Sequence, residues 1–269
     1  MASASATTTS EPIAHRFAAL AERRRKALVA YITAGHPDRA RSLALMRAVA
    51  RAGADIIEVG VPFSDPLADG PVIQASSQEA LEHGMTFDGA LDLIAEAAVD
   101  VPVVVFTYLN PLLAAGDGAL DRAARAGASG LLLTDVPVGA DPPLEARIAA
   151  GPLAFVRLAA PTTPAKRMAE IAQHGSGFVY LISRLGVTGI RDDVPADLPA
   201  TVERLRSAAS LPICVGFGIA RPEQAVAVAR LADGVVVGSA LVRLAGQSVD
   251  AAASFVASLR AALDTHARA

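Results

Sequence analysis

An apolar segment, a loop and the start of a helix follow one another in the stretch Ile56-Ile57-Glu58-Val59-Gly60-Val61-Pro62-Phe63-Ser64-Asp65-Pro66-Leu67-Ala68-Asp69-Gly70-Pro71. The apolar run Ile56–Gly60 predicts a short buried strand. The Pro- and Gly-rich residues after it predict a loop, and Pro71 is typical of the first turn of a helix. The stretch therefore predicts one strand–loop–helix unit.

The same unit recurs along the chain. Short apolar runs bounded by Gly, Pro or Asp predict eight strands: Leu28–Thr33, Ile56–Gly60, Val103–Tyr108, Gly130–Thr134, Leu153–Leu158, Gly177–Ile182, Ile213–Gly216 and Gly234–Val237. Helical patterns lie between them: Arg39–Ala52, Phe87–Ala98, Gly118–Arg125, Pro164–Gln173, Pro199–Ala208, Pro222–Arg230, Ala240–Leu244 and Ala251–Leu263. The strands lack strict alternation, as expected when helices cover both faces. We predict an α/β fold, a single (β/α)8 TIM barrel.

The alternative is an open doubly wound sheet with a small extra domain. No GxGxxG follows the first strand, and eight similar units favour closure. Residues 1–12 are expected to be a disordered lead-in and 13–269 the catalytic barrel, with an extra N-terminal helix over Ile13–Arg25 covering its bottom. Helix starts are predicted from N-caps at Asp38, Thr86, Thr163 and Asp250, and helix ends from Gly53, Gly84 and Gly127.

Composition excludes several classes of function. The 269 residues are 52% hydrophobic, enough for a sizeable core, and their net charge of −3 is scattered, so neither nucleic acid nor a membrane is an expected partner. No run approaches the roughly 18 apolar residues of a membrane span. The lone Cys214 lies in an apolar run and predicts a buried core thiol, and the five dispersed histidines predict no metal site. We expect a cytoplasmic protein.

The active site of such a barrel lies at the carboxyl ends of its strands. Glu58 is near the end of the second strand, Tyr108 ends the third, Asp135 follows the fourth and Tyr180 lies on the sixth. An acid at the end of a buried strand and a second acid, Asp69, in the following loop favour acid–base chemistry, because burial raises the pKa of one carboxyl group while polar loop groups keep the other ionised.

The loops after the last two strands predict a phosphate site. Gly216-Phe217-Gly218-Ile219 and Gly238-Ser239-Ala240 offer backbone amides and one hydroxyl group to an anion. Gly189 lies in the glycine-containing segment 183–193, which we expect to act as a mobile lid and to add an amide. Apolar and aromatic side chains are predicted to line the rest of the pocket: Ile73, Phe106, Tyr108, Leu132, Tyr180 and Phe217.

With these motifs assembled, the sequence resembles the alpha subunit family of tryptophan synthase. The hallmark segment is Glu58 to Pro71. Further similar stretches occur in order from about residue 13 to the C-terminus: Tyr31-Ile32-Thr33-Ala34-Gly35, Tyr108-Leu109-Asn110-Pro111, Asp135-Val136-Pro137, Leu158-Ala159-Ala160-Pro161-Thr162-Thr163-Pro164, Gly186-Val187-Thr188-Gly189 and Val215-Gly216-Phe217-Gly218-Ile219. His36 departs from the pattern, since an Asp is common there, and Phe106 and Leu109 vary the pocket wall.

The resemblance implies retro-aldol cleavage of indole-3-glycerol phosphate to indole and glyceraldehyde 3-phosphate. It implies that Glu58 is the acid–base group and that Asp69 holds the indole N–H. Thr188 would close the lid toward Asp69. The phosphate would be bound by Gly189, Gly218, Gly238 and Ser239.

The resemblance also implies a partner, a beta subunit that carries pyridoxal phosphate and forms an alpha2beta2 complex. Pro62 and Asp65 would face that partner, and this chain itself would need no cofactor and no metal. A stand-alone lyase and a catalytically silent activator of the beta subunit remain alternatives. Another phosphate-binding barrel enzyme is a further alternative, but it would be expected to use a catalytic Lys, and neither Lys26 nor Lys166 lies at a strand end facing the mouth.

Overall fold

The computed structural model describes residues 11–182, 195–216 and 218–267. Eight parallel strands form a closed barrel in which each strand pairs with its neighbours in sequence and β8 pairs with β1. Their bounds are β1 Ala27–Thr33, β2 Ile56–Gly60, β3 Val103–Thr107, β4 Ala128–Leu133, β5 Ala154–Ala159, β6 Val179–Ile182, β7 Ile213–Gly216 and β8 Gly234–Val237. The predicted barrel is confirmed.

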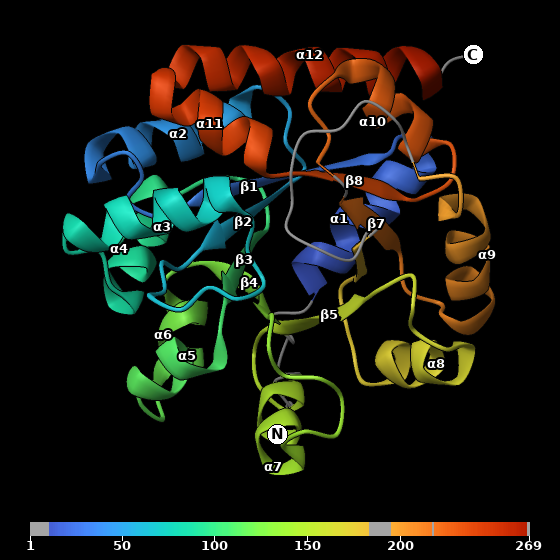
Figure 1. Cartoon of the computed structure of the whole chain (residues 1–269), viewed down its shortest axis with the longest axis horizontal. Coiled ribbons are helices and arrows are strands. Elements are labelled where there is room, and N and C mark those ends of the chain that lie inside the picture. The colour runs from blue at the N-terminus through green and yellow to red at the C-terminus, as the bar shows by residue number, and fades with distance from the viewer. Residues whose placement is uncertain (1–10, 183–194, 217, 268–269) are drawn as a thin grey trace, which may run out of the picture.

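Helices surround the strands (Figure 1). In the described ranges they are α1 Glu11–Glu22, α2 Arg39–Arg51, α3 Pro71–Glu82, α4 Phe87–Ala97, α5 Leu109–Ala114, α6 Ala119–Arg125, α7 Pro142–Ala149, α8 Ala165–Gln173, α9 Leu198–Ala208, α10 Pro222–Ala229, α11 Ser239–Gln247 and α12 Val249–Ala267. The last helix, α12, packs on α2, α10 and α11, and so joins the end of the chain to its first strand–helix unit.

Two apolar layers hold the barrel together. The larger layer fills the space between strands and helices, and the smaller one lies inside the barrel, where Val29, Ile56 and Val104 meet. Helix α1 closes the amino end of the barrel, as predicted, because Ile13 and Phe17 belong to the inner layer. The Phe17 and Phe178 rings lie 5.8 Å apart. The barrel is therefore a packed core, and Glu58 lies buried on β2 toward the carboxyl end.

Local sequence signals set most of the helix boundaries. Asp38 and Thr86 cap α2 and α4, each accepting a hydrogen bond from a backbone N–H three residues on, as predicted. Gly53, Gly84 and Gly127 follow helix ends with φ between +79° and +107°, a conformation that favours glycine.

Two predicted caps are wrong. The Thr163 hydroxyl accepts from the Ala160 N–H and closes a turn before α8, whereas Pro164 occupies the cap position. Helix α12 starts before Asp250, and the Ser248 hydroxyl group accepts from the Ala251 N–H at its first turn. In both cases a residue next to the predicted one lies at the start of the helix, Pro164 for α8 and Ser248 for α12. Sequence spacing alone does not show which of two adjacent residues is the cap.

Two short helices, α5 and α7, were not predicted from the sequence. Helix α5 contains Pro111, and Leu109-Asn110-Pro111 is also typical of a turn. Helix α7 begins with two prolines after its cap Asp141, which accepts from the Leu144 N–H at 3.0 Å. The third strand ends at Thr107, one residue before the prediction, because Tyr108 is the N-cap of α5. Helix α1 begins at Glu11, two residues earlier than predicted.

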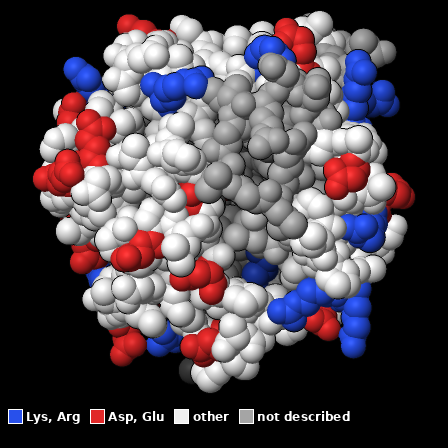
Figure 2. Space-filling model, viewed as in Figure 1, with Lys and Arg blue, Asp and Glu red and all other residues white. Residues whose placement is uncertain are grey.

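Cys214 is fully buried on β7, as predicted. Within the described ranges, no helix is long and apolar enough to span a membrane, and no group of three or more potential metal ligands occurs. Acidic and basic side chains are interspersed over the face of the molecule that Figure 2 shows.

Candidate active site

Glu58 is the central ionisable group at the carboxyl end of the barrel. It lies on β2 beside Tyr31 of β1 and Val104 of β3, and its side chain is fully buried. Neither carboxyl oxygen has a hydrogen-bond partner among the described residues. Burial alone raises its pKa to about 8. Glu58 therefore carries a proton at neutral pH and can give it to a bound molecule.

Asp69 is the second acid, and its environment differs. It lies two residues before α3 with 7% of its surface exposed. Burial raises its pKa to about 6, while a hydrogen bond that the Tyr108 hydroxyl donates to Oδ2 at 3.0 Å limits the rise. The two carboxyl groups thus differ in pKa, and between about pH 6 and 8 Asp69 is ionised while Glu58 is protonated.

Tyr108 is bound to the loop that carries Asp69. Its hydroxyl group accepts a hydrogen bond from the Ala68 N–H at 3.0 Å and donates one to Asp69. The centre of its ring lies 5.1 Å from the centre of the Phe63 ring. Sequence analysis predicted Tyr108 as a substrate-binding residue. In the structure, the Tyr108 hydroxyl group also connects the end of β3 to the loop after β2.

The side chains of two further tyrosines, Tyr31 and Tyr180, pack against glycines of neighbouring strands. A Cβ atom at Gly60 would lie 2.0 Å from the Tyr31 hydroxyl, and one at Gly216 would lie 2.4 Å from the Tyr180 hydroxyl. These glycines therefore leave the space that the two phenol groups occupy. Burial, together with the nearby acids Glu58 and Asp69, raises the pKa of both tyrosines well above its usual value.

Tyr31 was not predicted from the sequence as a site residue. Tyr31, Glu58 and Tyr180 each lie two residues before the end of their strand, so the period of two directs all three side chains to the barrel interior. That shared position is the signal that could have identified Tyr31.

Apolar side chains form a wall beside the acids. Ile73 of α3 packs with Tyr31 and Val242, and Phe106 meets the Tyr31 ring edge-on at 5.2 Å. The predicted wall residue Leu132 belongs instead to the inner layer of the barrel, with Val156 and Phe178.

The predicted phosphate end is described in part. Gly218 follows β7 with φ +85°, Gly238 precedes α11, and Ser239 is the buried first residue of that helix. Gly218 and Gly238 thus lie at the carboxyl ends of adjacent strands, where backbone N–H groups at a helix start attract anions. Thr188, Gly189 and Phe217 lie outside the described residues.

The loop after β2 presents different surfaces. Pro62, predicted to face a partner, is buried in this chain, whereas Asp65 is exposed and accepts a hydrogen bond from the Ser64 hydroxyl group. Leu67 is 92% exposed, a rare position for a large apolar side chain. The exposed part of this loop is therefore residues 64–65 and 67–68.

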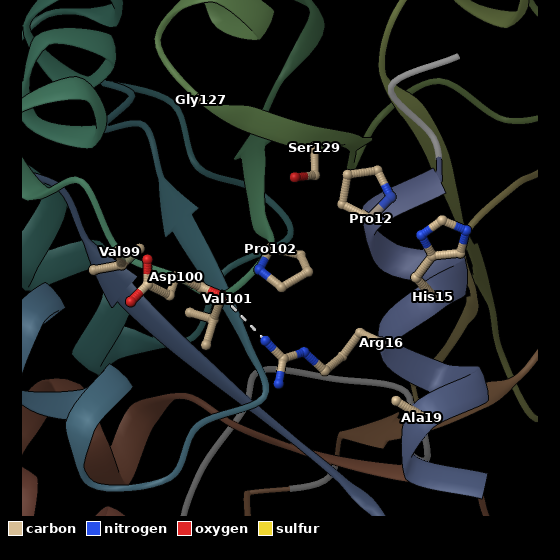
Figure 3. A pocket seen from close by; sticks show the side chains of 10 residues that line it. All are labelled: Pro12, His15, Arg16, Ala19, Val99, Asp100, Val101, Pro102, Gly127 and Ser129. Carbon is tan, nitrogen blue, oxygen red and sulfur yellow. Dashed lines mark hydrogen bonds between the residues drawn. The ribbon is translucent and has the colours of Figure 1, made fainter. Parts of the chain in front are cut away.

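A cavity of about 440 Å³ lies at the opposite, amino end of the barrel. It is bounded by α1, the segment before β3 and the start of β4, and the Arg16 guanidinium donates to the Asp100 carbonyl oxygen across it at 3.1 Å (Figure 3). Active sites of TIM-barrel enzymes lie at the carboxyl ends of the strands, whereas this cavity lies at the amino end. The candidate site is therefore the carboxyl end.

The closed parallel barrel, with its acids at the carboxyl ends of the strands, places the chain in the class of TIM-barrel enzymes. A family model described as "Tryptophan synthase alpha chain" matches residues 17–269, and the chain belongs to this family.

Curated relatives and solved structures agree with this assignment. The tryptophan synthase alpha chain of Caulobacter sp. (strain K31) is 48% identical over 238 residues, which are 87% of this chain and 86% of that protein. A structure of Mycobacterium tuberculosis tryptophan synthase matches with a TM-score of 0.88 at 34% identity, over 93% of this chain and 97% of that one. The Legionella pneumophila (strain Paris) alpha subunit matches at 0.86 and 34% identity, over 94% and 98%.

Proposed function

We propose that Glu58 is the acid–base group with which this member of the tryptophan synthase alpha chain family cleaves indole-3-glycerol phosphate to indole and glyceraldehyde 3-phosphate. The observation that carries the assignment is the fully buried Glu58 carboxyl group without a hydrogen-bond partner among the described residues. Such a group holds a proton near neutral pH, and no other interaction competes for that proton.

The reaction needs a proton at one atom and the loss of a proton at another. Glu58 protonates C3 of the indole ring, which becomes cationic and can accept electrons. The Glu58 carboxylate then takes the proton of the hydroxyl group next to the bond that breaks. The carbon–carbon bond electrons return to the ring, a carbonyl group forms on the glycerol fragment, and indole leaves. Glu58 ends the cycle protonated again.

Asp69 supports the cationic ring. An ionised carboxylate that accepts the indole N–H stabilises positive charge more in the transition state than in the substrate, which lowers the barrier. Oδ2 of Asp69 accepts a hydrogen bond from the Tyr108 hydroxyl group, and we assign the indole N–H to Oδ1. The apolar wall next to Asp69 would pack against the indole ring; it consists of Tyr31, Ile73 and Phe106.

The phosphate group binds at the opposite side of the mouth. Gly218, Gly238 and Ser239 supply backbone amides and a hydroxyl group, and Gly189 would add an amide from the segment after β6. In the same proposal, Thr188 closes over Asp69, and Phe217 and Tyr180 shape the pocket. Binding by amides at a helix start requires no basic side chain, in keeping with the net charge of −3.

A beta subunit completes the assembly. The alpha chain family carries no cofactor of its own, and we assign pyridoxal phosphate to the partner and an alpha2beta2 complex to the pair, in the cytoplasm. Exposed Asp65 and Leu67 support a docking surface on the loop that also carries Asp69. Docking on this loop would connect partner binding to the position of Asp69.

Indole release from indole-3-glycerol phosphate by the purified chain, alone and with a beta subunit, tests the proposal. Slow release that accelerates with the partner supports the whole account. Fast release by the chain alone indicates a stand-alone lyase. No release in either condition, with the beta subunit nevertheless activated, identifies a silent activator and contradicts the role of Glu58.

A further inference from the structure

Asp135 lies in the segment that follows β4, and its carboxylate contacts the start of α5. Its Oδ1 accepts from the Leu109 N–H at 2.8 Å. Leu109 directly follows Tyr108, the N-cap of α5, whose own side chain makes no capping hydrogen bond. Asp135 therefore supplies the acceptor that α5 lacks locally, from a segment 26 residues further along the chain.

This contact is connected to Asp69 through the peptide bond between Leu109 and Tyr108 and the hydrogen bond of the Tyr108 hydroxyl group. Asp135 fixes the backbone at Leu109, and the preceding residue, Tyr108, donates to Asp69 and accepts from Ala68. The segment after β4 is itself held on both sides. The Thr134 N–H donates to the Thr107 carbonyl oxygen at 3.1 Å, and the buried Arg157 guanidinium donates to the Val136 carbonyl oxygen at 3.2 Å.

We propose that Asp135 is a positioning residue, which holds the Tyr108 hydroxyl group on Asp69 and so keeps the Asp69 carboxylate ionised and oriented for catalysis. The inference rests on the proposed role of Asp69 in indole-3-glycerol phosphate cleavage. Asp135 is exposed at the mouth and accepts no other hydrogen bond within the described residues, so its contact with Leu109 is its structural role.

The position of Tyr108 matters because its hydrogen bond opposes the effect of burial on Asp69. The other titratable groups that face Asp69 are Tyr31 from β1 and Tyr180 from β6, and Glu58 from β2 faces the same two tyrosines. None of these groups donates a hydrogen bond to Asp69 in the structure, whereas Tyr108 does. Loosening Tyr108 therefore raises the pKa of Asp69.

The test compares Asp135→Ala, Asp135→Asn and a control, Asp141→Ala, in the full chain. Asparagine keeps an oxygen that accepts the Leu109 N–H. Asp141 also accepts a backbone N–H at a helix start, on α7, and within the described residues it makes no hydrogen bond to Asp135, Tyr108 or Asp69. Steady-state kcat/KM for indole release is measured from pH 5.5 to 8.5, together with thermal unfolding.

We expect kcat/KM of Asp135→Ala to fall about five-fold near pH 6 and the deficit to shrink toward pH 8, because only the ionised fraction of Asp69 changes. Asp135→Asn and Asp141→Ala should follow the wild-type pH profile within about two-fold. In a Tyr108→Phe background, Asp135→Ala should have no further effect on the profile, since the two changes act in series.

A pH profile of Asp135→Ala that parallels the wild type, or an equal loss in Asp141→Ala, would overturn the proposal and leave Asp135 as a helix cap only. A second measurement does not depend on activity. The Asp69 carboxyl carbon is titrated by NMR in the wild type and in Asp135→Ala, with a higher pKa expected in the variant. If the wild type releases no indole, the proposed function fails, and the NMR titration still decides whether Asp135 acts on Asp69.

Discussion

The Tyr108 hydroxyl group donates a 3.0 Å hydrogen bond to Oδ2 of Asp69 and accepts another from the Ala68 N–H. One side chain at the end of β3 thereby fixes both the charge and the position of an acid on the loop after β2. The exposed residues of that loop, 64–65 and 67–68, lie within a few residues of Asp69. The two hydrogen bonds of Tyr108 therefore connect this loop to the residue that follows β3.

Replacing Tyr108 with Phe tests this hydrogen bond. The variant keeps the ring that packs on Phe63 but loses the donor to Asp69. We expect the pKa of Asp69 to rise from about 6, so that the acid limb of the pH–kcat/KM profile moves up by roughly one unit. An unmoved acid limb, with thermal stability equal to that of the wild type, would contradict the role of Tyr108.

Replacing Asp69 with Asn removes the charge that, in the proposed mechanism, stabilises the cationic ring. We expect kcat to fall about 10- to 100-fold, since a hydrogen bond to a charged group contributes about 1.5–3 kcal/mol. The phosphate end should be unaffected. The inhibition constant of glycerol phosphate, measured as a competitive inhibitor, should therefore stay within about two-fold, and a large change in it would show that Asp69 shapes the whole mouth.

Glu58 makes stability depend on pH. Its pKa is about 8 in the folded chain against 4.5 for an ordinary Glu, so the folded state binds the proton more tightly than the unfolded state. The resulting stabilisation is fully present below about pH 4.5 and is lost as the pH rises through 8. Glu58→Gln should therefore raise the free energy of unfolding at pH 8.5 by about 5 kcal/mol at most, and by much less at pH 4.5. Equal gains at both pH values, from urea unfolding, would count against a buried, uncompensated carboxyl group.

The buried ion pair between Glu145 and Arg157 supports the segment after β4. Glu145 also accepts the Gly139 N–H, and the Arg157 guanidinium lies 3.7 Å from the centre of the Phe155 ring. Glu145→Ala should cost about 3–5 kcal/mol because it leaves a buried cation unpaired. The exposed Asp117–Arg147 pair is the matched control, and Asp117→Ala should change the free energy of unfolding by less than about 0.5 kcal/mol. Similar losses in both variants would mean that Arg157 finds another partner.

Much of this architecture could be predicted from the chain because its signals are local. Buried strands such as Ile213–Gly216 and Gly234–Val237 were located at their observed bounds, since short apolar runs between Gly, Pro and Asp have few alternatives. Helices α5 and α7 were missed because proline in the first turn is typical of loops as well as of helix starts.

The contacts of the site were less predictable. Nothing in the sequence shows that the Tyr108 hydroxyl group binds Asp69, because the two residues meet only when β2 and β3 pair in register. The resemblance implies that Pro62 faces a partner, and in this chain the turn after β2 buries it. Side-chain partners across strands depend on tertiary geometry, which local pattern does not contain.

The rate of indole release from indole-3-glycerol phosphate by wild-type chain and Glu58→Gln, each with saturating beta subunit between pH 5 and 9, tests the central claim most directly. The account predicts a bell-shaped wild-type profile with limbs near pH 6 and 8, and a Glu58→Gln variant that binds substrate but turns over about 10²- to 10⁴-fold more slowly. A Glu58→Gln variant with near-normal turnover would contradict it.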